Sequence, residues 1–229
     1  MQTSAQVIIL LRPGKRIIMK NETVFWDVDT QYDFMRPEGR LYVAGAEGII
    51  DNVSRVRRFA LDNGYSIIAS TDWHKEDNKE ISARPDFKTT FPSHCIAGKP
   101  GSERVGYLGE LPIDDVPNRE LQTGELQKLL DKKQFHIVMR KEEIDPFSNP
   151  NAKTLMGLLK PASVVVFGVA LDLCVKQLVE GLVKMGGIKV YLLRDAVKGL
   201  GVKSHDDVIE ELRQKGVEII TLADLNKKF

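Results

Sequence analysis

The sequence predicts an α/β protein with a three-layer α/β/α, Rossmann-like fold, built on a mostly parallel sheet of about six strands. Short apolar segments rich in β-branched residues alternate with helical patterns along the 229-residue chain, which is typical of βα units. The strongest strand covers residues 163–167 (SVVVF), and such an unbroken run suits a strand buried on both faces of a parallel sheet. No repeat or linker interrupts the alternation, so we expect a single domain over residues 19–229.

The other elements follow from the same patterns, taken in order. A strand over residues 23–28 (TVFWDV) precedes a helix from Gly48, whose apolar residues recur on one face until Asn63-Gly64 ends it. Further strands are expected at residues 66–69 and 136–139, and a short helix at 151–159. After the 163–167 strand, the order is a helix (172–184), a strand (188–193), a helix capped by Ser204 and ended by Gly216, and a last strand (217–220).

Two regions do not follow this alternation. Residues 1–18 carry three basic residues around Pro13-Gly14, and they form either an extra β-hairpin or a tail ahead of a start at Met19. Residues 72–115 show little periodicity, and a long irregular loop in a compact domain tends to be functional. This loop follows the second strand, where open α/β sheets bind their ligands.

The composition excludes several classes of protein. There are 33 Lys and Arg against 32 Asp and Glu, a net charge of +1, whereas nucleic-acid and membrane-surface binding usually need a basic excess. The early apolar run at residues 7–11 is far shorter than the roughly 20 residues of a membrane helix. The two cysteines build no disulfide framework. We therefore expect a cytoplasmic protein that acts on a small molecule. The sequence leaves open whether it forms a homo-oligomer.

Cys174 is a candidate nucleophile because it lies between the strongest strand and the next helix (FGVALDLCVK). A thiol in the first turn of a helix feels the positive end of the helix dipole, which lowers its pKa and favours the thiolate. The alternative is a small buried core residue. Cys95, beside His94 in the long loop, has a weaker claim to a chemical role.

Asp27 and Asp29 end the first strand in WDVDTQYDF, and residues two apart in a strand share a face. This spacing allows both carboxylates to point into one site. The stretch Asp-x-Asp-Thr (residues 27–30) resembles that of the haloacid dehalogenase-like phosphatases, in which the first Asp is the nucleophile and Mg²⁺ is bound. Alternatively, only Asp29 matters, as a base for a thiol.

Asp72 and His74 follow the second strand at a spacing of two, and His94 follows in the same loop. A carboxylate and imidazoles suit Zn²⁺, Fe²⁺ or Mn²⁺, although scattered surface residues would give the same pattern. Lys141 follows the strand at residues 136–139, with Arg140 beside it as a competitor for any role.

Four motifs in this order, VDTQYDF, STDWH, FPSHCIAGKPG and GVALDLCV, resemble those of the isochorismatase-like cysteine hydrolases and, among them, the metal-dependent nicotinamidases. The resemblance covers residues 21–222. It implies a catalytic triad of Asp29, Lys141 and Cys174, with Lys141 the loosest match because RKEEIDPFSN departs from the commoner pattern. It also implies a cis peptide between Val169 and Ala170, and an oxyanion hole made by the N–H groups of Ala170 and Cys174.

The same resemblance implies a divalent metal, most often zinc with iron or manganese as alternatives, and aromatic residues around a pyridine ring. The ligand positions fall on Asp72, His74, Glu80 and His94, and the third of these is more often His in the family. The aromatic positions fall on Phe34 and Phe91, the second of which is commonly Trp.

Taken together, the resemblance implies an amidohydrolase that converts nicotinamide to nicotinate and ammonia through a Cys thioester. Three alternatives stay open on the sequence: a related hydrolase of another small amide or an isochorismate-like substrate, a Mg²⁺-dependent phosphatase using Asp27 and Asp29, and a non-catalytic metal-binding protein. The phosphatase interpretation leaves Cys174 and the histidines without roles.

Overall fold

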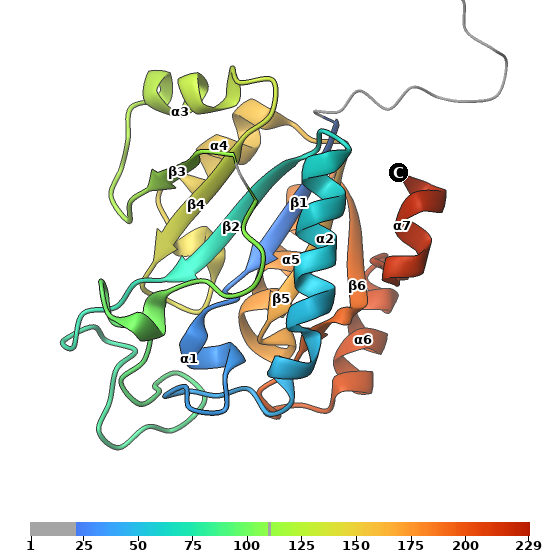
Figure 1. Ribbon diagram of the computed structural model, residues 1–229. Coiled ribbons are helices and arrows are strands. Elements are labelled where there is room, and N and C mark those ends of the chain that lie inside the picture. Colours follow the sequence, from blue (N-terminus) through green and yellow to red (C-terminus); the bar gives the residue numbers. More distant parts are fainter. Residues whose placement is uncertain (1–21, 110) are drawn as a thin grey trace, which may run out of the picture.

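The computed structural model, which describes residues 22–109 and 111–229, is built around a seven-stranded sheet in which every strand pairing is parallel (Figure 1). The strands follow the spatial order β3-β4-β2-β1-β5-β6-β7. Their bounds are β1 Thr23–Val28, β2 Ser66–Asp72, β3 Ile113–Val116, β4 His136–Lys141, β5 Ser163–Val169, β6 Lys189–Lys198 and β7 Glu218–Ile220.

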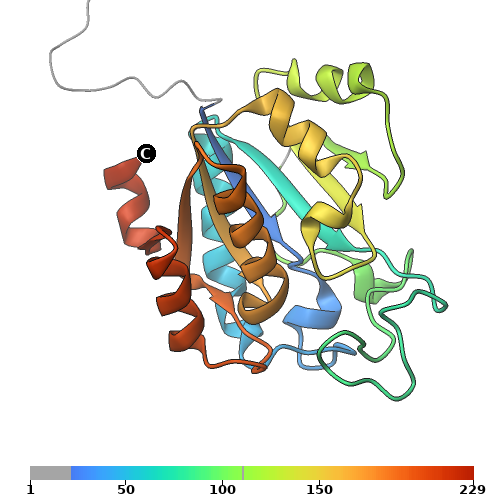
Figure 2. The ribbon, with the colours of Figure 1, turned by 180° about the vertical axis from the view of Figure 1, so that it is seen from behind.

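Helices cover both faces of the sheet, which makes three layers (Figures 1 and 2). Helix α2 packs on one face with α7, while α4, α5 and α6 pack on the other. The helices are α1 Tyr32–Met35, α2 Ile50–Asp62, α3 Thr123–Leu130, α4 Ala152–Leu159, α5 Lys176–Met185, α6 His205–Gln214 and α7 Leu222–Lys228, with short turns η2 Ala46–Ile49, η3 Pro100–Ser102, η4 Pro146–Ser148 and η5 Leu171–Val175. Each face has its own apolar core, because every residue of the central strands is buried. The predicted α/β/α fold is confirmed.

The structure differs from the predicted elements in three places. Strand β3 overlaps the end of the stretch expected to be irregular (72–115). It was not predicted because its sequence IDDV is short, acidic and partly exposed at the sheet edge. Helices α3 and α7 were not predicted, because each buries a single residue, Leu126 and Leu225 respectively, and neither shows a clear apolar face. The helix predicted over residues 172–184 divides into η5, a π-helical turn, and α5. The prediction for residues 1–18 lies outside the described residues.

The register of the sheet brings distant residues to one edge. Asp72, the last residue of β2, pairs with Lys141, the last of β4, and Val28 of β1 pairs with Gly168 of β5. Since all these strands run in the same direction, the residues that follow them meet at the carboxyl edge of the sheet. None of the described helices is long and apolar enough to cross a membrane.

Gly168 sits where β5 comes close to β1. Its φ is +119°, and a Cβ at this position would lie 2.1 Å from the carbonyl oxygen of Val28. We expect Gly168→Ala to lower the free energy of unfolding by about 2–4 kcal/mol, because the new methyl clashes with backbone and the left-handed φ disfavours Ala. Gly157→Ala is the matched control: it lies within α4, with nothing within 4 Å of an added Cβ, and should gain up to about 1 kcal/mol. Equal urea midpoints for the two variants would contradict this packing.

Candidate active site and metal centre

Asp29, Lys141 and Cys174 come together at the carboxyl edge of the sheet. Asp29 directly follows β1, Lys141 ends β4, and Cys174 lies in η5, the turn after β5. The Nζ of Lys141 lies 3.0 Å from Oδ2 of Asp29 and 3.7 Å from Sγ of Cys174. All three side chains are buried. The Lys141 amine therefore contacts both the Asp29 carboxylate and the Cys174 thiol away from water.

The prediction that Asp27 and Asp29 share one site is wrong. Asp29 adopts a left-handed conformation (φ 48°), so the alternation of side chains ends with Val28. Asp27 is buried elsewhere, where its carboxylate accepts hydrogen bonds from Arg57 at 2.7 Å and from Arg104. A carboxylate tied to two guanidinium groups is a poor nucleophile, and this arrangement removes the basis of the phosphatase interpretation.

Burial and neighbouring charges set the protonation states of the three groups. Burial raises the pKa of Asp29 to about 6, although Lys141 opposes this shift. Burial alone would lower the pKa of Lys141, but the carboxylates of Asp29 and Asp72 outweigh it and raise that pKa well above its usual range. Lys141 is therefore a permanent ammonium ion, and Asp29 is an acid or base that titrates close to neutrality.

The pKa of Cys174 is raised well above its usual value, first by burial and also by the nearby carboxylates of Asp29 and Asp72, while Lys141 partly offsets this. The sequence-based expectation of a lowered thiol pKa is therefore not met. The expected regular helix start is replaced by η5, in which the N–H of Val175 donates to the carbonyl of Ala170 at 3.1 Å. The peptide between Val169 and Ala170 is cis, as the family resemblance implied.

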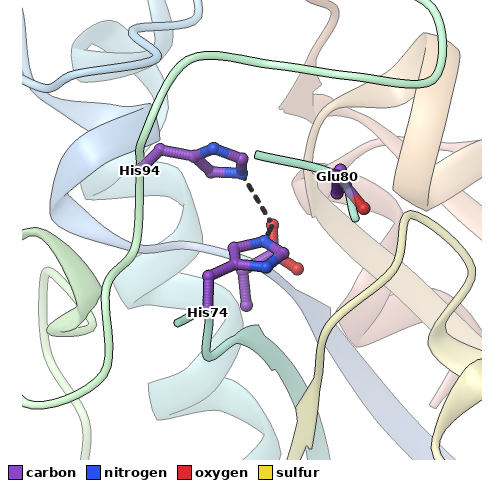
Figure 3. A group of neighbouring side chains, drawn as sticks. His74, Glu80 and His94 are labelled. Atoms are coloured by element: carbon purple, nitrogen blue, oxygen red, sulfur yellow. Dashed lines mark ion pairs between the residues drawn. The ribbon is translucent and has the colours of Figure 1, made fainter. Parts of the chain in front are cut away.

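Four potential metal ligands lie beside these groups. Asp72 ends β2, His74 follows it, and Glu80 and His94 come from the long loop. Each offers a ligand atom, and these atoms lie within 4.8 Å of one another. Figure 3 shows the side chains of His74, Glu80 and His94 gathered at one place. The Nε2 atoms of His74 and His94 lie 3.6 and 3.5 Å from Oδ2 of Asp72.

The donor set fits a divalent cation. Both ring nitrogens of His74 are buried without a hydrogen-bond partner among the described residues, and a buried polar atom normally has one. The Nδ1 of His94 lies 2.7 Å from the carbonyl of Pro92, which orients its Nε2 toward Asp72 in the manner usual for metal-binding histidines. Burial and Asp72 raise the pKa of Glu80 to about 7. Two imidazoles and two carboxylates suit Zn²⁺, Fe²⁺ or Mn²⁺.

The metal group and the Asp29–Lys141–Cys174 group share one ion pair. The Nζ of Lys141 donates to Oδ1 of Asp72 and, at 3.0 Å, to the carbonyl of Glu143. Asp72 therefore faces the histidines with one oxygen and the ammonium ion with the other.

A mostly apolar pocket opens between these groups. Phe34 and Phe91, the positions expected to surround the substrate ring, both line it, and so do Cys174 and three of the four potential metal ligands. The other apolar residues of its wall were not predicted, and they come from separate loops and turns: Leu41, Val43, Ile144, Leu173 and Leu200. Such residues carry no local pattern that separates them from core residues.

Two polar residues that position the site were also missed. Gln31 donates to the carbonyl of Asp72 at 2.8 Å and accepts from its N–H at 2.7 Å. Asp33 accepts from the N–H of Cys95 at 2.7 Å, which anchors the loop next to His94. A signal was present, because both belong to the VDTQYDF motif and a polar side chain after a buried strand needs a partner.

The chain is similar in sequence and fold to several known proteins. A nicotinamidase/pyrazinamidase of Mycobacterium tuberculosis is 27% identical over 196 residues, covering 84% of this chain and 95% of the relative. A nicotinamidase of Escherichia coli is 25% identical over 222 residues, covering 86% and 93%. The crystal structure of a pyrazinamidase of Pyrococcus horikoshii in complex with zinc matches with a TM-score of 0.68 and 26% identity, covering 88% of this chain and 99% of that one.

A model of the isochorismatase domain matches residues 24–224, a span that contains the seven strands apart from Thr23, the first residue of β1, and every residue of the two groups described above. The chain therefore belongs to the isochorismatase family of hydrolases.

Proposed function

We propose that the protein is a nicotinamidase-like amidase, which hydrolyses a small aromatic carboxamide such as nicotinamide to the carboxylate and ammonia. The observation that carries the proposal is the position of Lys141, whose Nζ lies next to Asp29, Cys174 and Asp72. Lys141 therefore contacts the candidate nucleophile, the candidate base and a potential metal ligand, all beside an apolar pocket. Similarity to nicotinamidases at 25–27% identity supports the substrate class.

The first half of the reaction forms a thioester. Asp29 accepts the proton of the Cys174 thiol as Sγ bonds to the amide carbon, which avoids a free thiolate among carboxylates. The ammonium ion of Lys141 stabilises the charge on Asp29 and near the sulfur. The N–H groups of Ala170 and Cys174 stabilise the oxyanion of the tetrahedral intermediate. Asp29 then returns the proton to the amide nitrogen, the C–N bond breaks, and ammonia leaves.

The second half hydrolyses the thioester. Asp29 accepts a proton from water as the water oxygen attacks the thioester carbon, and the same oxyanion site holds the intermediate. The C–S bond then breaks, the carboxylic acid forms, and Cys174 regains its proton from Asp29. Both halves need Asp29 ionised at the start and protonated in the middle, which suits a group that titrates near 6.

Asp72, His74, Glu80 and His94 would hold the metal, most often zinc, which when bound supplies a Lewis acid for a ring nitrogen of the substrate. Phe34 and Phe91, which line the same pocket, would pack against the aromatic ring. An orientation fixed by both contacts lowers the entropy cost of attack by Cys174.

Ammonia release from a panel of amides tests the proposal. Nicotinamide and pyrazinamide have a ring nitrogen and a carboxamide, whereas benzamide keeps the ring and the amide but lacks the nitrogen. We expect kcat/KM for nicotinamide to exceed that for benzamide by at least about 100-fold, as the loss of one oriented buried contact implies. Preference for an aliphatic amide would place the protein elsewhere in the family, and no release from any amide would contradict the proposal.

The rate should depend on the ionisation of Asp29. Because its pKa is raised to about 6, the carboxylate form needed to accept the thiol proton is present above pH 6 and is lost below it. We expect kcat/KM to fall about tenfold per pH unit below 6, while circular dichroism shows that the protein stays folded. A rate independent of pH between 4.5 and 7 would exclude Asp29 as the base.

Metal content tests the ligand set independently of activity. We expect the purified protein to carry about one equivalent of a divalent transition metal, and His74→Ala to bind it at least tenfold more weakly, because one of its ligands is lost. His205→Ala is the control, since His205 begins α6 outside this group. Equal metal content in the two variants by elemental analysis would reject the site.

A further inference from the structure

A second cavity, of about 430 Å³, lies beside β4 and the segment that follows η3. Apolar side chains form part of its wall: Trp73, Leu108, Ile113 and Val138. Its volume falls within the range of small-molecule sites, and such sites combine apolar walls with a few placed polar groups. The cavity shares no lining residue with the pocket beside Cys174.

The charged residues around this cavity are mainly basic. Lys99, Arg104 and Arg140 line it, with Glu103 as the acidic residue among the described lining residues. Glu103 and Lys99 are exposed at the rim. Arg140 pairs with Asp115 at 2.5 Å, but Asp115 is half-exposed, so water screens this pair.

Two buried arginines beside this cavity, Arg57 and Arg104, share a single carboxylate. The carboxylate of Asp27 pairs with both Arg57 and Arg104, which leaves one positive charge in excess among these described residues. His136 lies 2.9 Å from Arg104 but adds no charge at neutral pH, because burial and Arg104 lower its pKa to about 3. Burial lowers the pKa of Arg57 to about 10, and the positive charge of Arg104 contributes to this shift. An unbalanced buried charge is costly unless an anion approaches it.

Arg104 and Arg140 have donors to spare for such an anion. The side chain of Arg104 is only 6% exposed, and its Nε has no hydrogen-bond partner among the described residues. Arg140 bonds Asp115 through Nε and Thr71 through one terminal nitrogen. Its guanidinium lies 3.9 Å above the ring of Trp73, which holds it flat against the cavity wall.

We propose that this cavity is a binding site for a small organic anion, whose carboxylate or phosphate pairs with Arg104 and Arg140 and whose flat apolar part lies against the Trp73 side of the wall. Lys99 adds a third cation at the rim. Guanidinium groups bind carboxylate and phosphate in this way through charge-assisted hydrogen bonds. The site is separate from the catalytic pocket and does not depend on the proposed amidase activity.

Tryptophan fluorescence gives a direct test, because the chain has two tryptophans, of which Trp26 is fully buried and Trp73 lines the cavity. AMP and benzoate are the phosphate and carboxylate probes, and adenosine and benzyl alcohol are their neutral counterparts. We expect at least one anion to change the emission with saturation below about 1 mM, more weakly at high salt, and the neutral compounds to have no effect. Trp73→Phe should abolish the signal.

Paired variants distinguish anion binding at this site from a general effect of the protein's positive charge. Lys99→Gln/Arg140→Gln should weaken anion binding at least tenfold, whereas Arg119→Gln/Lys153→Gln, which changes two exposed cations elsewhere, should leave it unchanged. No response to either anion, an equal response to the neutral compounds, or equal loss in both double variants would overturn the site. Affinity for inorganic phosphate as high as that for AMP would overturn the assignment of an organic ligand.

Discussion

Cys174→Ala should lower kcat/KM for amide hydrolysis by at least about 10³-fold while leaving the fold intact. Without the sulfur no thioester forms, and Asp29 has no thiol from which to accept a proton. Removal of a covalent nucleophile typically lowers kcat/KM by about 10³-fold or more. The fold should tolerate the change, because Ala replaces a small side chain in η5 without disturbing backbone bonds. Steady-state ammonia release and thermal unfolding of the purified variant check both statements.

Cys95→Ala is the matched control. Cys95 is also buried, and it lies next to His94, but its Sγ donates to the carbonyl of Gly101 at 3.7 Å, whereas the Nζ of Lys141 contacts the Sγ of Cys174. We expect this variant to keep its rate within about fivefold of the wild type. If Cys95→Ala loses the activity and Cys174→Ala keeps it, the nucleophile has been assigned to the wrong cysteine.

Lys141→Met should have the second largest effect, on both rate and stability. The ammonium ion lies between the buried carboxylates of Asp29 and Asp72, and removing one partner of a buried ion pair costs about 3–5 kcal/mol. The rate should fall at least about 10²-fold, because Asp29 loses the charge that stabilises its ionised form. Urea unfolding and kcat/KM measure the two effects.

The thiol reports the same change in a second way. Lys141 lowers the pKa of Cys174 against the effect of burial, so its removal raises that pKa further, and iodoacetamide should alkylate Cys174 only at higher pH. Lys153→Met, an exposed lysine of α4, should change neither the alkylation profile nor the rate. Lys141→Arg keeps the charge, so its alkylation profile should stay close to that of the wild type. A wild-type alkylation profile in Lys141→Met would contradict the assignment.

Much of the fold could be predicted because each central strand is buried and therefore consists mainly of apolar, often β-branched residues. Six of the seven strands were located in this way, whereas β3 was missed because an acidic edge strand resembles a loop. The positions that follow the strands were also predictable, since parallel strands bring their carboxyl ends together. Asp29, Asp72 and Lys141 meet for this reason.

The rest of the site depends on local backbone that the sequence did not reveal. The alternation rule placed Asp27 beside Asp29, but the left-handed conformation of Asp29 turns its side chain away from that face. The same rule worked for Arg140 and Lys141, which continue β4 and point in opposite directions, toward Trp73 and toward Asp29 respectively. The thiol pKa was predicted in the wrong direction because burial and nearby carboxylates exceed the effect of a helix start.

Trapping the covalent intermediate tests the central claim most directly. The wild-type protein is mixed with nicotinamide, quenched in acid during turnover, digested, and analysed by mass spectrometry. We predict that the peptide containing Cys174 gains the mass of a nicotinoyl group less one hydrogen, and that the peptide containing Cys95 is unchanged. Ammonia release by the wild-type protein without any adduct on Cys174 at any quench time would contradict a thioester mechanism at this residue.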